Sequence, residues 1–423
     1  MKLVKSLILG SAAGFAAVAG AQAADLPVKK AAPVEYVKVC STYGAGFFYI
    51  PGTDTCLRVS GRVRADYRYN TPGTRASDAV GFFTRGRIQL DARTNTAYGL
   101  LRSVVRYELN RGLGFPGSGT NGTITNTSNL AQAFVQFGGL TAGRVTTFFD
   151  NGDLPTGHMG TLRFSDSPDV DLIAYTFTFG NGFSATLSLE DGIERRAGLL
   201  RAGLTGPDVY GGQRAPDVVG NIKYAGTWGS AQLSAAGHQI RVANPYAIGT
   251  FSDTVDTEYG YAVQANVGVN LPMLAPGDAL WLNAVYANGA LAYITGGSSS
   301  SLGLSTGTVS GALVDGYVNA NGNLSTGRGW SIAGGLRHYW TQSIRQNVFG
   351  SYARVTYSGA TPLADFNELR VGTNVFWQPV SGLDIGVEAM YVKLDPRTFV
   401  GTGLPINSAD HAWEGRVRVQ RDF

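Results

Sequence analysis

Apolar and polar residues alternate with a period of two through most of the chain after residue 56. In residues 57–69, one set of alternate positions is apolar or aromatic and the other is mostly charged, from Arg58 to Arg68. The last residues repeat the pattern, because Val417, Val419 and Phe423 alternate with arginine, glutamine and aspartate. A period of two places the two sets on opposite faces of a β-strand. The pattern therefore predicts strands with one apolar face and one polar face.

Sixteen segments can be placed in this way, and short and long connections alternate between them. The predicted strands are 57–69, 82–94, 100–110, 130–137, 140–147, 172–179, 183–190, 218–226, 230–240, 259–270, 279–287, 329–340, 344–357, 367–377, 383–394 and 412–423. Short turns include Asn181-Gly182, whereas 148–171 and 288–328 are long. This rhythm is typical of a transmembrane barrel with short periplasmic turns and long outer loops. The predicted fold class is an all-β, antiparallel, sixteen-stranded transmembrane β-barrel.

Composition supports this fold class. The chain has 58 glycines, 20 tyrosines and 20 phenylalanines, only 15% of its residues are charged, and no useful helical periodicity follows residue 24. A soluble β-sandwich would also alternate, but its polar faces would favour mixed Lys, Glu and Thr, whereas the first three strands here are rich in arginine. Closure into a barrel also removes the sheet edges that lipid would not tolerate.

The N-terminus predicts export. Lys2 and Lys5 precede an apolar run over 7–20, and Ala21-Gln-Ala23 has the form of a cleavage site, so residues 1–23 are predicted to be a signal peptide. The run is too short to span a bilayer as a helix. Cleavage removes two lysines and no acid, so the formal charge falls from +4 to +2 and gives no support for a nucleic-acid partner. Residues 24–56 are predicted to be a linker and a disulfide-closed loop, and 57–423 the barrel.

The two cysteines, Cys40 and Cys56, predict a disulfide. An exported chain enters an oxidising compartment, where such a pair can oxidise. A bond closing this loop is worth roughly 3 kcal/mol in the chain-entropy estimate. A metal site is the alternative, but two thiols without a nearby histidine are a poor ligand set. The four histidines are scattered along the chain, and no metal or cofactor is expected.

Three segments resemble a known family. The stretch from Val37 to Gly61 resembles the N-terminal segment of alphaproteobacterial porins, and Ala133–Arg144 resembles the turn and strand before a porin's third loop. The terminal Phe423 resembles the signal read by the barrel-assembly machinery. The resemblance implies a homotrimeric diffusion pore in the bacterial outer membrane, surrounded by lipid and lipopolysaccharide. It also implies that the third long loop folds into the lumen and narrows it.

The function of such a pore depends on its diameter and on the charges at its narrowest point. Strand parity gives the candidate wall residues, namely Arg58, Arg62, Arg64, Arg85, Arg87, Arg93, Arg102, Arg106 and Arg144. Five acids form the candidate constriction loop, namely Asp150, Asp153, Asp166, Asp169 and Asp171. The alternative is that these aspartates cap turns at the surface. With the acids on the inserted loop, we expect a weakly cation-selective channel.

Three other functions stay open at this stage. A channel specific for a solute such as a sugar would show a track of aromatic residues on the lumen face, which the pattern lacks. A barrel-type outer-membrane enzyme would need a catalytic group converging at one rim, and no catalytic residue is predicted. A structural or adhesive barrel usually has fewer strands and a filled lumen, whereas sixteen strands leave an aqueous channel. A passive channel for small hydrophilic solutes and ions is therefore preferred, and no enzyme activity is expected.

Overall fold

The computed structural model describes residues 38–72, 75, 77–113, 122–201, 207–208, 210–243, 246–248, 251–253, 255–295, 313–319, 322–357, 365–398 and 410–423. The predicted signal peptide (1–23) and most of the predicted linker lie outside these residues. Nearly all regular structure in the described part is β-strand, with three short 3-10 helices and no α-helix. None of these helices is long and apolar enough to cross a membrane.

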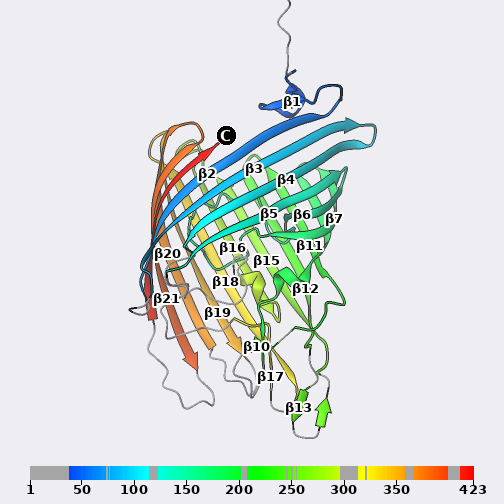
Figure 1. Ribbon diagram of the computed structural model, residues 1–423, viewed down its shortest axis with the longest axis vertical. Coiled ribbons are helices and arrows are strands. Elements are labelled where there is room, and N and C mark those ends of the chain that lie inside the picture. Colours follow the sequence, from blue (N-terminus) through cyan, green and yellow to red (C-terminus); the bar gives the residue numbers. More distant parts are fainter. Residues whose placement is uncertain are drawn as a thin grey trace, which may run out of the picture.

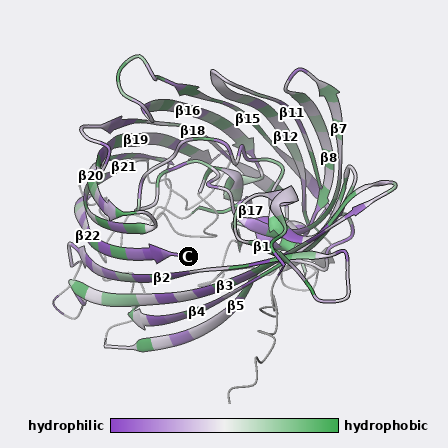
Figure 2. Cartoon of the chain, turned by 90° about the horizontal axis from the view of Figure 1, so that it is seen from above, coloured by the Kyte–Doolittle hydropathy of each residue, from purple (hydrophilic) through white to green (hydrophobic). Residues whose placement is uncertain are grey.

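Sixteen long strands form a closed antiparallel barrel (Figures 1 and 2). They are β2 (Cys56–Asn70), β3 (Val80–Thr96), β4 (Gly99–Leu113), β5 (Ile124–Phe137), β6 (Leu140–Thr146), β7 (Asp169–Gly180), β8 (Phe183–Glu190), β11 (Asp217–Gly226), β12 (Gly229–Ile240), β15 (Glu258–Asn270), β16 (Ala279–Asn288), β18 (Leu324–Tyr339), β19 (Ile344–Tyr357), β20 (Asp365–Val380), β21 (Leu383–Thr398) and β22 (Asp410–Asp422). Each pairs with the next, and β22 pairs with β2 to close the ring. The sixteen predicted strands are confirmed.

The alternation seen in the sequence separates an outer face from an inner face. On β2, Val63 and Tyr67 are 55% and 41% exposed on the outer face, whereas Asp66 between them is 1% exposed. On β15, Val263 is 43% exposed and the adjacent Gln264 is 1% exposed. Outward apolar side chains suit a barrel in a bilayer, and inward polar side chains suit an aqueous interior.

The ends of the barrel chain meet at a seam between β2 and β22. The Gly61 N–H donates to the Phe423 carbonyl at 2.8 Å, and the Phe423 N–H donates to the Gly61 carbonyl at 3.1 Å. A Cβ placed on Gly61 would lie only 2.5 Å from the Phe423 ring and 2.6 Å from the Arg87 carbonyl oxygen. Glycine is therefore required at position 61 so that the terminal ring can lie against the first barrel strand.

A small module precedes the barrel and lies beyond its end (Figure 1). It contains the 3-10 helix η1 (Ser41–Tyr43) and β1 (Phe47–Tyr49), which pairs with the start of β2. Cys40 and Cys56 are joined by a disulfide with Cα atoms 6.0 Å apart, which confirms the predicted bond. Both cysteines are buried against Phe47. The bond ties the segment before the barrel to the first residue of β2.

Turns and aromatic residues fit the two sides of a membrane. Asn181 and Gly182 both have positive φ, 52° and 87°, as a tight two-residue hairpin between twisted strands requires. Exposed aromatic residues such as Trp228 and Trp377 lie near the short-turn end, and Tyr261 and Trp413 lie towards the long-loop end. Two aromatic bands of this kind mark the interfaces of an outer-membrane barrel.

The long connections contain short elements that the sequence pattern did not predict. They are β9 (Leu199–Arg201), β10 (Pro207–Asp208), β13 (Tyr246–Ile248), β14 (Phe251–Asp253), β17 (Gly316–Val318), and the 3-10 helices η2 (Gly192–Arg195) and η3 (Leu291–Ile294). β17 pairs with both β18 and β9, so two long connections are joined. The buried Asp315 carboxylate strengthens this junction, because it accepts from the Ala197 N–H, the Leu291 N–H and the Tyr210 hydroxyl.

Candidate pore constriction

Residues 147–168, between β6 and β7, fold into the barrel, and we call them the inserted loop. Its base is held by Glu190 of β8, which accepts from the Thr147 hydroxyl at 2.6 Å and the Phe148 N–H at 3.0 Å. The carbonyls of Phe148 and Phe149 accept from side-chain amides of Asn221 and Gln264 on the neighbouring wall. The loop therefore turns inward directly after β6, as the resemblance implied.

The loop then runs along the wall formed by β12 to β21, and at its edge Arg416 of β22 donates to the Met159 carbonyl. The side-chain amide of Asn151 donates to Asn266 of β15 at 2.9 Å, and Arg337 of β18 donates to the Pro155 carbonyl at 3.0 Å. The N–H groups of Met159 and Gly160 both donate to Glu388 of β21, each at 2.6 Å. Loop backbone groups inside a barrel need partners, and the far wall supplies them.

A buried ion cluster fixes the end of the loop. The Arg163 guanidinium donates to Glu368 of β20 at 2.8 Å, and Arg370 contacts the same carboxylate. Arg370 also donates to the Thr161 carbonyl at 2.9 Å. Burial, reinforced by the nearby Arg370, lowers the pKa of Arg163 to about 10, and Glu368 opposes this effect. The group therefore stays charged at neutral pH and remains paired with Glu368.

Apolar side chains fill the space between the loop and this wall. Phe149, Leu162 and Phe164 of the loop join Leu291, Tyr293 and Ile294 of η3 and wall residues such as Trp281 and Phe349 in one buried cluster. Phe149 and Tyr293 meet edge to face, with ring centroids 4.7 Å apart. Full burial of such side chains is worth roughly 1.5–3 kcal/mol each. This part of the lumen is therefore a packed core.

The opposite side of the lumen carries what we call the arginine wall. It consists of the inward guanidinium groups of β2, β3, β4 and β22, namely Arg62, Arg64, Arg68, Arg85, Arg87, Arg102, Arg106, Arg416 and Arg418. Arg416 lies at the edge of this surface that the inserted loop reaches, because it donates to the Met159 carbonyl. In the strand register Arg62 lies opposite Arg87, Arg64 opposite Arg85, and Arg68 opposite Arg416. Like charges directly opposite each other on neighbouring strands are destabilising. Something must therefore offset them.

Buried carboxylates between the arginines offset part of this repulsion. Asp66 contacts Arg418 at 2.8 Å, Arg68 at 3.2 Å and Arg64 at 3.6 Å. Glu108 is shared by Arg85 and Arg87, and Asp91 by Arg93 and Arg102. The acids lie beneath the guanidinium groups, because the side chains of Asp66, Asp91 and Glu108 are 0%, 2% and 5% exposed, whereas that of Arg62 is 29% exposed.

Six of the nine predicted wall residues lie on this surface: Arg62, Arg64, Arg85, Arg87, Arg102 and Arg106. Arg58 and Arg93 instead stack on Phe47 of the N-terminal module, at 5.6 Å and 4.8 Å from the ring centroid. Arg144 lies opposite Asp171 in the register and shares its strand face with the exposed Leu140. This alternation places it on the outer side, where it also contacts Glu194.

The five predicted loop acids have different surroundings. Asp150 is buried and accepts from the Ser165 hydroxyl at 2.7 Å and the Ser167 N–H at 2.9 Å, which joins the two legs of the loop. Burial raises the pKa of its carboxyl, although the Arg195 guanidinium 3.9 Å away acts in the opposite direction. A buried, hydrogen-bonded acid of this kind holds the loop together instead of facing the lumen.

The other four acids are more accessible. Asp153 pairs with Lys223 at 2.7 Å, and Asp166 is 3.8 Å from the His158 ring nitrogen with a 34% exposed side chain. Asp169 and Asp171 belong to β7: Asp169 accepts from Gln132 at 2.7 Å, and Asp171 lies 3.6 Å from Arg144. Asp153 and Asp166 are thus the members of the predicted set that remain exposed on the inserted loop itself.

Several important residues were absent from the sequence-based set. Arg416 and Arg418 belong to the arginine wall, and their parity in the last strand would have indicated it. Glu368, Arg370 and Glu388 hold the inserted loop, and strand parity alone gives them only an inward direction. Their role depends on which loop meets which wall, a contact that local sequence does not specify.

Comparison with known proteins decides the family. The family model described as "Porin subfamily" matches residues 25–415. Porin Omp2b of Brucella canis is 32% identical over 430 residues, covering 99% of both chains, and Porin Omp2b of Brucella melitensis is 31% identical over 430 residues. The chain belongs to the porin family. This porin is thus a diffusion channel of the bacterial outer membrane.

Solved structures agree on the fold. The outer membrane channel DcaP of Acinetobacter baumannii superposes with a TM-score of 0.64 at 15% identity, covering 89% of this chain and 99% of that chain. OmpT of Vibrio cholerae in a trimer form gives a TM-score of 0.51 at 11% identity, covering 88% of this chain and 100% of that chain. At these identities the likeness concerns the barrel alone, and the properties of this porin's lumen come from its own residues.

Proposed function

We propose that the water-filled passage of this porin is eccentric and lies between the arginine wall and the inserted loop. The observation that carries the proposal is the filling of the other side of the lumen by the loop, η3 and the wall from β12 to β21. Small hydrophilic solutes and ions would then cross by passive diffusion, and the loop would set the size limit. A firmly anchored loop suits a fixed size limit, because its backbone bonds to several strands at once.

Removal of the loop anchors tests this passage. The double variant Glu368→Ala/Glu388→Ala removes the acceptors for Arg163 and for the Met159 and Gly160 N–H groups. Single-channel conductance should rise or fluctuate between levels, and larger neutral sugars should enter proteoliposomes. The matched control is Glu194→Ala, which removes a carboxylate that contacts Arg144 on the outer side. Unchanged conductance in the double variant, with the barrel folded, would contradict the proposal.

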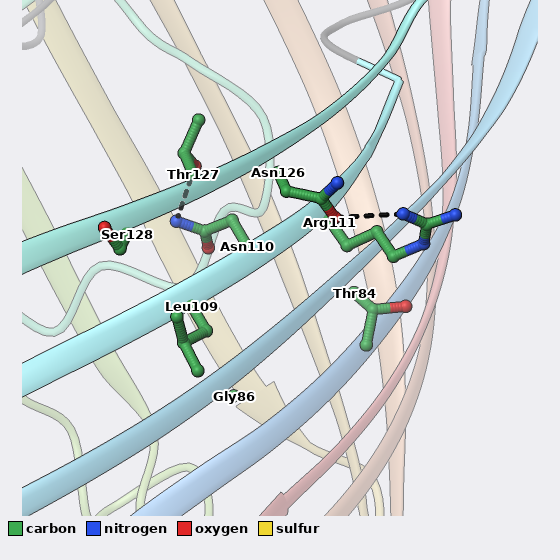
Figure 3. Close-up of a pocket in the computed structure, with 8 residues that line it drawn as sticks. All are labelled: Thr84, Gly86, Leu109, Asn110, Arg111, Asn126, Thr127 and Ser128. Atoms are coloured by element: carbon green, nitrogen blue, oxygen red, sulfur yellow. Dashed lines mark hydrogen bonds between the residues drawn. The ribbon is translucent and has the colours of Figure 1, made fainter.

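We also propose that three copies assemble through the outer face of β2 to β5. Between its large apolar side chains, such as Val63 and Ile88, this face carries small or polar residues, including Ala65, Thr84 and Gly86. A hollow of about 530 Å³ opens here, lined by Thr84, Gly86, Leu109, Asn110, Arg111, Asn126, Thr127 and Ser128 (Figure 3). Arg111 donates to Asn126 at 2.9 Å within it. A hollow with the polar side chains of Arg111, Asn126 and Ser128 on the outer face suits contact with a second copy better than contact with hydrocarbon.

Two matched glycine variants test the assembly. Gly86 has no atom within 4 Å of an added Cβ, and the nearest atom to a Cβ on Gly220, on the outer side of β11, is 3.9 Å away. Gly86→Phe should therefore fold but lose the trimer in unheated detergent electrophoresis, whereas Gly220→Phe should keep it. Trimers of both variants would refute the assignment of this face. The lipid, lipopolysaccharide and barrel-assembly partners remain part of the same proposal, with Phe423 as the assembly signal.

We propose no catalytic role, because the family consists of channels. The weak cation selectivity expected from the sequence remains a prediction. It depended on five acids of the constriction, and the geometry leaves only Asp153 and Asp166 exposed on the inserted loop. The charges of the described residues favour the opposite sign.

A further inference from the structure

We infer that the arginine wall is a binding surface for small anionic solutes that carry a carboxylate or phosphate group, and that it makes this porin anion-preferring. The inference rests on the proposed passage between the wall and the inserted loop. The inference says which solutes the channel favours, whereas the proposed passage says where solutes cross the barrel and what limits their size.

The depth of the charges is the first support. Each of the three buried wall carboxylates is shared by at least two arginines, and Asp66 is shared by three. The side chains of Arg62, Arg85, Arg87 and Arg102 are 20–29% exposed, above acids that are at most 5% exposed. A solute in the passage therefore meets guanidinium groups before carboxylates. Asp422, which pairs with Arg62 at 2.6 Å, is an exposed exception at the end of β22.

Excess positive charge is the second support. Arg62 and Arg87 face each other across the β2–β3 register, and Arg106 donates to the neutral Gln89 at 2.8 Å. Among the described residues, the buried Nε of Arg68 has no hydrogen-bond partner, and Nε of Arg64 is 3.6 Å from Asp66, beyond hydrogen-bond distance. An oxyanion would relieve the repulsion between opposed arginines. Guanidinium groups bind carboxylate and phosphate in a bidentate manner, which favours these two chemical groups.

The loop side of the passage does not balance this charge. Asp153 already pairs with Lys223, and Asp150 is buried between Ser165, Ser167 and Gln264. Asp166 keeps a 34% exposed side chain, but His158 lies 3.8 Å from it. Within the described residues, the passage therefore has at least four partly exposed arginines on one side, whereas Asp153 and Asp166 are the two accessible acids of the inserted loop on the other.

The test is the reversal potential of the full-length porin in a planar bilayer across a potassium chloride gradient. Ionic strength should stay near 0.1 M, where the screening length is about 10 Å. The wild type should show a reversal potential on the anion side, and Arg62→Gln/Arg87→Gln should lower the anion-to-cation permeability ratio severalfold. The matched control is Arg421→Gln, because Arg421 has the outer-face parity of Val417 and Val419 and bonds to the Ser381 carbonyl.

Two further measurements separate charge from binding. Acetate and inorganic phosphate should each lower chloride conductance in the wild type, and an effect of only one identifies which of the two groups is bound. Arg62→Lys/Arg87→Lys keeps the charge but loses the bidentate fork, so it should keep anion preference while weakening this competition. These conservative variants also serve if the glutamine pair fails to fold.

Three outcomes would overturn the inference: a wild-type reversal potential on the cation side, no shift in the glutamine pair, or no competition by either oxyanion. The anchor variants described above report separately on the passage. A conductance change in Glu368→Ala/Glu388→Ala combined with a cation-side reversal potential would keep the passage and remove the anion surface. Unchanged conductance in Glu368→Ala/Glu388→Ala combined with an anion-side reversal potential would support the anion surface and contradict the proposed loop constriction.

Discussion

The two inner surfaces of the barrel share one alternation but carry different chemistry. On β2 to β4 and β22, inward positions hold arginines above buried acids. On β11 to β20, many inward positions hold amides, such as Asn221, Gln264 and Asn374, whose N–H groups bond to loop carbonyls or to acids beside the loop. Neutral amides can satisfy a backbone that lies against them, whereas crowded guanidinium groups require water or anions.

This difference explains why the inserted loop lies on one wall and, apart from the contact of Met159 with Arg416, leaves the other open. Docking on the amide-bearing wall satisfies loop N–H and C=O groups and buries Phe149, Leu162 and Phe164. Docking on the arginine wall would remove several guanidinium groups from water without enough carboxylates to pair with them, and unpaired buried charges are costly. On the wall that the loop does contact, Glu368 pairs with the buried Arg163 and Arg370. The inserted loop therefore lies on the wall where docking costs less free energy, and the passage lies beside the other wall.

Loss of Arg163 should give the largest effect on this comparison. Arg163→Ala leaves Glu368 with Arg370 alone and opens space beside Leu162. Breaking a buried pair costs about 3–5 kcal/mol, so loop docking should weaken strongly. Conductance should become noisy or larger, and limited proteolysis should cut within 152–166. Arg345→Ala, which breaks a more exposed pair with Asp384 near the short turns, should leave the conductance levels unchanged.

Neutralisation of loop acids should give an intermediate effect. Asp166→Asn/Asp169→Asn should shift the reversal potential further towards anions, but by less than the arginine pair shifts it towards cations. Asp169 belongs to β7 and accepts from Gln132 and Thr146, so only Asp166 of this pair lies on the inserted loop. Both shifts should shrink at molar salt, where the screening length falls to about 3 Å. A shift of the reversal potential as large as that of Arg62→Gln/Arg87→Gln, or larger, would show that the loop controls selectivity.

The smallest effect should come from Asp150→Asn, and it should depend on pH. Burial raises the pKa of Asp150 in the folded state, so the charged carboxylate is a penalty that grows as pH rises through that value. The variant lacks this penalty but loses part of its hydrogen bonding, worth about 1 kcal/mol. The difference in free energy of unfolding between the variant and the wild type should therefore favour the variant most at neutral pH and less in acid. Thermal unfolding at pH 7 and pH 4 measures the difference, and the opposite trend would contradict the assignment.

The sequence by itself determined the strands, the two faces and the disulfide pair. Residues 57–69 alternate because a strand turns successive side chains to opposite sides, and this local rule needs no tertiary contact. It therefore placed Arg62, Arg87 and Arg106 on the lumen face. It also placed Cys40 and Cys56 close enough in the chain to expect the bond that the structure contains.

Only the tertiary structure decided how the lumen is divided. The pairs Arg163–Glu368 and Gly160–Glu388 join residues about two hundred positions apart, and they exist because the closed ring brings β20 and β21 to face the loop. The same closure buried Asp150 and left the side chain of Asp166 34% exposed, although both are aspartates in one loop. Exposure of a charge depends on what packs over it. In this barrel that covering comes from strands distant in the sequence, so local pattern could identify the charged residues but not which of them face water.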